Sequence, residues 1–278
     1  MKLLAFLFFP GPHQPMRHWI LEETNYGHVR DNRYDVAVLP LGATEPHNLH
    51  LPYGTDIFEA SQIAAQAAEA AWNHGARVVV LPTLPYGTQT NQHAFPLAMN
   101  LYPSTLGRVI SDLVESVHRA GISKMLILNS HGGNELKSVL RELIGGSVHL
   151  FLCDWFRSIS ADVQADLFED PGDHAGEMET ALALAYFPDL VAHDPESGRL
   201  SADDGAVRST RFDAVNNGWI SITRPWHLLT TNTGVGNPHP ATAESGRKLM
   251  ATLVERLSGF LIELGEADVD DCFPYPSA

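Results

Sequence analysis

The chain has 278 residues, enough for one large α/β domain or two small ones. Hydrophobic residues make up 44% and charged residues 18%, which is typical of a soluble globular protein. The net charge of −15 argues against nucleic-acid binding, because an acidic surface repels the phosphate backbone. The two cysteines, Cys153 and Cys272, lack the CxxC spacing of zinc or redox motifs and do not indicate an oxidising compartment, so we expect a cytoplasmic protein.

The N-terminal apolar run at residues 3–9 is too short to cross a bilayer, which takes about 20 residues. It weakly resembles a signal peptide, but no small-x-small cleavage site follows it. An N-terminal strand, or an anchor on the surface of a partner subunit, is the better interpretation. No other segment is long and apolar enough to span a membrane, and we expect no membrane partner.

Short apolar runs predict strands at residues 35–39, 77–81, 124–128 and 147–152. The runs are continuous rather than alternating, which is typical of strands buried on both faces of a parallel sheet. Between and after them, helical patterns cover residues 56–74, 104–120, 134–144, 177–186 and 240–264. This alternation predicts a three-layer αβα fold with a mainly parallel central sheet.

Residues 192–238 differ from the rest because they are rich in Gly, Ser, Asp, Asn and Thr. We interpret them as a loop-rich excursion with one strand near residues 219–223, which closes over the site or forms an oligomer contact. No repeat or linker divides the chain, so a single domain over residues 1–278 is the simplest prediction.

The first group of chemically active residues lies between the first strand and the first helix. Glu45, His47, His50 and Asp56 fall within this loop, at the edge of a parallel sheet where sites form. Asp56 has two interpretations: it caps the helix, which is the commoner role for a lone Asp, or it bridges metal ions. His50 is a candidate for supporting the ligands.

The second group follows the third strand and reads Asn-Ser-His131-Gly-Gly-Asn. Its position places His131 at the same edge of the sheet as the first loop. An anion-binding glycine loop is the alternative, but the GxGxxG and GxxxxGK[ST] patterns of nucleotide sites are missing.

The third group, from Asp173 to Glu179, opens the fourth helix and contains His174 and Glu177. Glu177 and Glu179 are two residues apart and cannot both face inward on one helix. An acidic first turn also has the ordinary role of complementing the helix dipole. Three loops that bring imidazoles and carboxylates, without thiolates, to one edge favour Zn, Mn or Fe in a hydrolytic site.

These three motifs, in this order and spacing, resemble those of the creatininase family of metal-dependent amidohydrolases, and the likeness runs from about residue 34 to 257. The resemblance implies a centre of two divalent ions per chain. In it Asp56 would bridge both ions, Glu45 and His131 would complete one, and His47 and Glu177 the other. His174 would be the acid–base residue beside Glu177 that passes a proton to the leaving nitrogen. The resemblance also implies a homo-oligomer such as a hexamer.

The chain departs from the family pattern at several positions. Creatinine-cleaving members take one carboxylate from a His-x-Glu after the third strand, and here Gly133 occupies that place. Pro46 stands where the family usually has Gln, and Asn48 where it has Gly. Tryptophan is missing just before the third motif, where creatinine cleavers place one near the substrate. Creatinine is therefore a doubtful substrate.

Candidate substrate contacts are His93, which follows the second strand at the correct edge, Trp155 as a substitute tryptophan, and Asp173. The expected reaction is hydrolysis of a C–N bond in a small cyclic amide or formamide, by a water whose pKa the metals lower. One alternative is another bond, a lactone or phosphoester, although the three motifs contain no Lys or Arg for a phosphate clamp. Another is a non-catalytic family member that assists peptide or cofactor maturation, which an intact ligand set disfavours.

Overall fold

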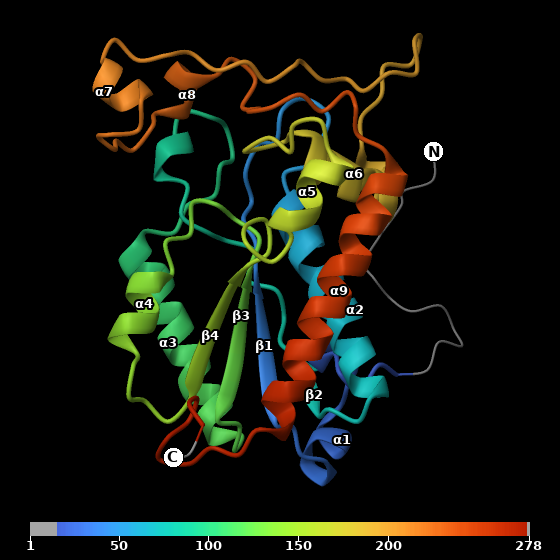
Figure 1. The fold of residues 1–278 in the computed structure, drawn as a ribbon, viewed down its shortest axis with the longest axis vertical. Helices are drawn as coiled ribbons and strands as arrows, with labels where there is room; N and C mark the ends of the chain where they lie inside the picture. The colour runs from blue at the N-terminus through green and yellow to red at the C-terminus, as the bar shows by residue number, and fades with distance from the viewer. Residues whose placement is uncertain (1–15, 277–278) are drawn as a thin grey trace.

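The computed structural model describes residues 16–276, and its centre is a parallel sheet of four strands in the order β2-β1-β3-β4 (Figure 1). The strands lie where the apolar runs predict them, at Val36–Leu41 (β1), Val78–Val80 (β2), Lys124–Asn129 (β3) and His149–Asp154 (β4). This arrangement confirms the predicted α/β class. The apolar run at residues 3–9 lies outside the described residues.

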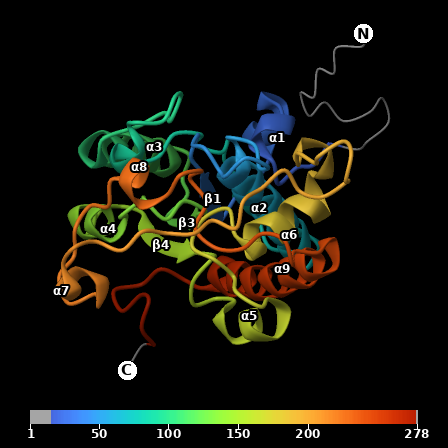
Figure 2. The same cartoon turned by 90° about the horizontal axis from the view of Figure 1, so that it is seen from above.

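Helices cover both faces of the sheet, which makes the three predicted layers (Figure 2). Val36, Val38 and Leu126 point to the face packed by α2 (Thr55–Asn73), α6 (Glu177–Tyr186) and α9 (Ala243–Glu266). The alternate residues, including Ala37, Leu39 and Met125, point to the opposite face, where α3 (Pro103–Arg119) and α4 (Lys137–Glu142) pack. Because every strand residue of β1 and β3 is buried, both runs read as continuous apolar sequence.

The register of the strands brings their carboxyl ends together. Leu41, the last residue of β1, pairs with Asn129 of β3, and Asn129 in turn pairs with Asp154 of β4. The loops that follow β1, β3 and β4 therefore start at the same level of the sheet. This edge is where ligand sites form in open parallel sheets.

The predicted strand near residues 219–223 is wrong, because the described part of this segment contains no strand. Trp219 is 78% exposed and follows Gly218, whose positive φ of 72° belongs to a turn. None of the four strands in the described part of the chain pairs with the segment, so its β-branched residues stay in irregular backbone. The excursion from residue 192 to 238 instead holds two single-turn helices and lies across the loop side of the sheet (Figure 1).

The predicted helix at residues 134–144 is shortened to α4, and the remaining elements are short. They are η1 (Leu21–Glu23), α1 (Tyr26–Asp31), η2 (Thr90–Gln92), α5 (Ala161–Leu167), η3 (Pro188–Leu190), α7 (Asp213–Asn216) and α8 (Trp226–Leu229). Within residues 16–276 no helix has both the length and the apolar character needed to cross a membrane.

Candidate active site

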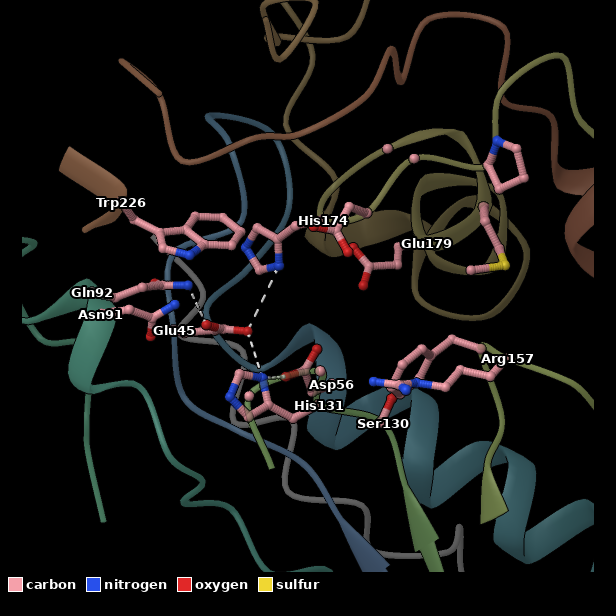
Figure 3. Close-up of a pocket in the computed structure, with 18 of the residues that line it drawn as sticks. Glu45, Asp56, Asn91, Gln92, Ser130, His131, Arg157, His174, Glu179 and Trp226 are labelled. Atoms are coloured by element: carbon pink, nitrogen blue, oxygen red, sulfur yellow. Dashed lines mark hydrogen bonds and ion pairs between the residues drawn. The ribbon is translucent and has the colours of Figure 1, made fainter. Parts of the chain in front are cut away.

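Four of the predicted ligands meet at the carboxyl end of the sheet. Glu45 and His47 come from the loop after β1, Asp56 from the first turn of α2, and His131 from the loop after β3. All four side chains are buried. His131 Nδ1 lies 2.9 Å from Glu45 Oε1 and 3.1 Å from Asp56 Oδ2 (Figure 3). The sequence therefore predicts the centre of this cluster correctly in space.

Asp56 does not cap its helix. The N-cap of α2 is Gly54, and no side chain accepts a capping hydrogen bond there. The carboxylate of Asp56 instead lies between two imidazoles, with Oδ1 3.1 Å from His47 Nε2 and Oδ2 facing His131. Of the two interpretations that the sequence leaves open, the geometry favours the bridging one.

Three histidines at this site share one pattern: one ring nitrogen contacts a backbone carbonyl, and the other faces a carboxylate. The contacts to carbonyls are His47 Nδ1 to Glu45 O at 3.0 Å, His131 Nε2 to Thr88 O at 3.0 Å, and His174 Nε2 to Pro46 O at 2.9 Å. A nitrogen bonded to a carbonyl must carry the proton, so a neutral ring turns its lone pair to the carboxylates. This pattern is usual for metal-binding histidines, because a cation between lone pair and carboxylate removes the repulsion.

Without a cation, the imidazoles must take up protons to meet the same carboxylates. Burial lowers the pKa of His47, but attraction to Asp56, Glu179 and Glu45 outweighs it and raises this pKa to about 10. His131 behaves likewise: burial opposes the charge, yet Glu45 and Asp56 raise its pKa well above the ordinary value. The pKa of Asp56 is lowered in turn by the two histidines, despite its burial. The site is therefore built to hold positive charge, which fits divalent metal ions.

The predicted ligand Glu177 needs correcting. Its carboxylate turns away from the cluster and accepts hydrogen bonds from the backbone N–H groups of Glu169 (2.8 Å) and Asp170 (3.1 Å). Glu179 faces the cluster instead and forms a possible ligand group with His47 and Asp56. Glu177 is the first residue of α6, and side chains two positions apart leave a helix in different directions, so only one of the pair reaches the cluster.

A cavity of about 400 Å³ opens above these ligands. Its lining includes Glu45, Asp56, His131, His174 and Glu179. Of the predicted substrate contacts, only Asp173 lies in it. The ring of His174 packs against that of His47 at a tilt of 32°, with 4.1 Å between ring centroids, and its Nδ1 lies 3.7 Å from Glu45 Oε1, so the predicted acid–base residue lies beside the cluster.

The other two substrate predictions are not supported by the positions of these residues. His93 is exposed and is not among the cavity-lining residues, because its neighbour Gln92 turns inward and hydrogen-bonds Glu45 through Nε2. Trp155 is fully buried in the core between the sheet and its helices. Its indole N–H donates to Ser130 Oγ at 2.8 Å, and Ser130 in turn donates to Glu59.

Comparison with known proteins gives the family. The family model described as creatinine amidohydrolase matches residues 22–261. This chain belongs to the creatininase family. A solved structure of a putative creatinine amidohydrolase from Bacteroides fragilis superposes with a TM-score of 0.82 at 35% identity, covering 91% of this chain and 99% of that one. The family that the three motifs indicate is thus confirmed, and the chain is a creatininase-family hydrolase.

Curated relatives carry at least three different activities, a peptidase, a creatinine amidohydrolase and a 3-dehydro-scyllo-inosose hydrolase among them. A mycofactocin precursor peptide peptidase of Mycobacterium ulcerans is 26% identical over 78% of this chain and 81% of the relative. The creatinine amidohydrolase of Pseudomonas putida is 29% identical over 57% and 67%. Solved creatininases described as a manganese form and as a Zn-Zn type share the fold at TM-scores of 0.69 and 0.67, with 19% and 20% identity, covering 90% of this chain and 100% of theirs.

Membership of the creatininase family makes the departures at Pro46 and Asn48 informative. Asn48 has a positive φ of 53°, a conformation that glycine adopts freely and asparagine tolerates. Its backbone N–H donates to Thr233 Oγ1 at 2.9 Å. The backbone carbonyl of Pro46 accepts hydrogen bonds from His174 and Thr233. Both substitutions therefore preserve the loop.

The glycine at position 133 excludes the ligand that creatinine-cleaving members of the family take from there. A Cβ atom at Gly133 would lie 2.3 Å from Thr88 O and 2.4 Å from His131 Nε2. No carboxylate side chain fits at this position without moving His131. Residue 133 thus cannot supply a carboxylate ligand here. A carboxylate from α6 in its place is consistent with this.

Three of the cavity residues outside the sequence motifs carry a guanidinium or an indole group. Arg157 follows β4, and Arg224 and Trp226 come from the excursion; all three line the cavity. Trp226 is buried, with its ring edge-on to His174 at 4.8 Å between centroids, and its indole nitrogen has no hydrogen-bond partner. For Arg157 a usable signal existed, since it follows the end of a buried parallel strand. For the excursion the sequence carries no such signal.

Proposed function

We propose that this creatininase-family hydrolase cleaves C–N bonds of amides with the help of two divalent metal ions. The observation that carries the proposal is the pattern of His47 and His131, each tied to a backbone carbonyl by one nitrogen and turned to buried carboxylates by the other. Such an arrangement is stable when cations lie between the imidazoles and the carboxylates. The ligand types suit Zn or Mn.

In the proposed centre Asp56 would help to hold both ions, because it belongs to both ligand groups. Glu45 and His131 complete one ligand group with it, and His47 and Glu179 complete the other; the ligand atoms in each group lie within 4.8 Å of one another. Solved creatininases containing manganese or zinc support this choice of metals. When bound, ions of this kind polarise a carbonyl and lower the pKa of a water at neutral pH.

His174 is the proposed proton carrier. The Nε2–H of its ring donates to the carbonyl of Pro46, which fixes the ring, and Nδ1 faces the cluster. Nδ1 accepts a proton as the water oxygen bonds to the amide carbon, and gives it to the nitrogen as the C–N bond breaks. The products are then a carboxylic acid and an amine.

The proposed substrates are amides in general, and peptides belong among them beside small cyclic amides and formamides. A peptidase and a creatinine amidohydrolase among the relatives both support C–N hydrolysis. The cavity of about 400 Å³ has room for one amino-acid residue and its neighbouring peptide group.

The test is metal analysis together with an amide panel. We expect the full chain, stripped by a chelator and reloaded with Zn or Mn, to bind about two ions and to hydrolyse at least one member of a panel of creatinine, N-formyl amides and short peptides. Asp56→Ala should lose both ions. Glu69→Ala, an exposed acidic residue on the same helix, is the matched control and should keep them. Fewer than about one ion per reloaded chain would contradict the two-metal proposal.

A further inference from the structure

Arg157 is a cationic side chain in the cavity that the proposed reaction does not use. It lies in the turn after β4, where its backbone N–H donates to Asp154 O at 3.0 Å. Its side chain lines the same cavity as Asp56 and Ser130, and Figure 3 shows it reaching from the rim toward both of them. A guanidinium therefore stands beside the proposed metal ligands.

The Nε side of this guanidinium is held in place by its neighbours, whereas its two terminal nitrogens are not. Arg157 Nε lies 3.7 Å from Asp154 Oδ2, and its central carbon lies 5.5 Å from the centre of the Phe156 ring. Within residues 16–276 the ion pair of Arg157 is made through Nε, and its two terminal nitrogens make no hydrogen bond. Arg224 differs, because its terminal Nη2 is already bound to Asp173 at 3.0 Å. Of the two arginines that line the cavity, Arg157 is thus the one whose two terminal nitrogens are both without a hydrogen bond.

We infer that Arg157 binds a carboxylate of the substrate, so that the amides taken by this enzyme carry an acid group close to the scissile C–N bond. N-acyl amino acids and the C-terminal residue of a peptide have this chemistry. The planar fork of a guanidinium matches the two oxygens of a carboxylate. This inference rests on the proposed amide hydrolysis, and it adds the substrate class.

Charge in the cavity agrees with an anionic substrate. Two divalent ions would exceed the charge of the three carboxylates Glu45, Asp56 and Glu179, and Asp173 is paired with Arg224. Arg157 then adds positive charge at the rim, where its one acidic contact is made through Nε with Asp154 at 3.7 Å. Its side chain is 60% exposed, so water screens the contact and the gain in binding is modest, about tenfold.

The experiment compares binding of acids and matching amides to the metal-loaded protein by calorimetry. The probes are the N-acetyl derivatives of alanine, leucine and tyrosine, each as free acid and as carboxamide, with the phosphonate analogue of N-acetylalanine as a further anion. We expect the wild type to bind acids about tenfold more tightly than amides. Arg157→Gln should abolish this preference and Arg157→Lys should restore part of it. Arg224→Gln should change it less than about threefold, because that charge is already compensated.

Arg108→Gln, an exposed arginine of α3 outside the cavity, is the control and should leave the preference unchanged. The inference is overturned if the wild type shows no preference for acids, including the case in which neither form binds. It is also overturned if Arg157→Gln keeps the preference, since the metals would then hold the acid, or if the phosphonate binds more tightly than the carboxylate through Arg157. Acids that bind through Arg157 but are never hydrolysed would contradict the proposed function alone.

Discussion

The floor and the rim of the cavity are built in different ways. The floor, formed by Glu45, His47, Asp56 and His131, is buried, and its histidines are tied to backbone carbonyls. The rim, represented by Arg157, Asp173 and Arg224, is solvent-exposed and comes from loops. Floor residues start directly from strand ends and a helix start, so their positions follow from the sheet. The positions of rim residues depend on loops that the sheet does not constrain.

This difference separates chemistry from selectivity. A rigid floor keeps the distances between ligands, which a binuclear centre needs. A rim on exposed loops changes without disturbing those distances. Two relatives of this chain named for different substrates are consistent with such a division. Changes at the floor should therefore alter metal content and rate, whereas changes at the rim should alter substrate preference.

The largest effect should come from substitutions in α6, where Glu179 faces the floor of the cavity and Glu177 does not. Glu179→Gln removes a proposed ligand and should lower the metal content by about one ion and the rate by at least about a hundredfold. Glu177→Gln leaves the metals in place. Because its carboxylate accepts two backbone N–H groups, this change should instead lower the free energy of unfolding by about 1–3 kcal/mol.

Elemental analysis and denaturant unfolding of the two variants measure these effects side by side. Since both variants make the same chemical change two residues apart, each serves as the control for the other. Loss of metal in Glu177→Gln, with full metal in Glu179→Gln, would restore the ligand set that the sequence alone predicts.

The next largest effect is the release of protons from the floor histidines when metal binds. In the metal-free protein the pKa of His47 is raised to about 10 and that of His131 is also raised, so both rings are protonated at pH 7.5. Metal binding must displace these protons, and we expect about two to be released per chain. Apparent metal affinity should therefore fall as the pH is lowered. Calorimetry in buffers of different ionisation enthalpy measures the release.

The same raised pKa has a consequence for the metal-free protein. Stability contributed by protonated His47 is fully present below its unfolded pKa of 6.5 and is lost as the pH rises through about 10. His47→Gln should flatten this pH dependence and release about one proton fewer on metal binding. Metal binding without proton release would show that the rings are neutral in the metal-free protein.

The sequence predicts the floor well because its residues follow apolar runs. Each run fixes a buried strand, each strand end fixes a place at one edge, and Glu45 and His131 lie in the loops that start there. It is harder to predict which of Glu177 and Glu179 faces the cluster, because this depends on which residue begins α6. Periodicity places a helix within a few residues, which is too coarse to decide between side chains two positions apart.

The rim could not be predicted from the same signals. Residues 219–223 look like a strand, yet none of the four strands in the described part of the chain pairs with them. The sequence analysis selects Trp155 and not Trp226 as a substrate contact, and only the packing shows that Trp155 lies in the core and Trp226 on the cavity. Irregular chain takes its path from tertiary contacts, such as that of Thr233 with Pro46, which no local pattern encodes.

The smallest effects should come from these two tryptophans, and they test whether Trp226 acts on substrate. The indole N–H of Trp226 is buried without a partner, so Trp226→Phe should change the free energy of unfolding by less than about 1 kcal/mol. The same change should raise KM about threefold to tenfold if this N–H donates to a substrate oxygen.

Trp155→Phe removes the bond to Ser130 and some core volume, so it should cost about 1–3 kcal/mol of stability. Its effect on KM should be small, because Trp155 does not line the cavity. Denaturant unfolding and steady-state kinetics on both variants give the comparison. An unchanged KM in Trp226→Phe would leave this tryptophan only a packing role against His174, and recognition at the rim would then depend on the charged groups.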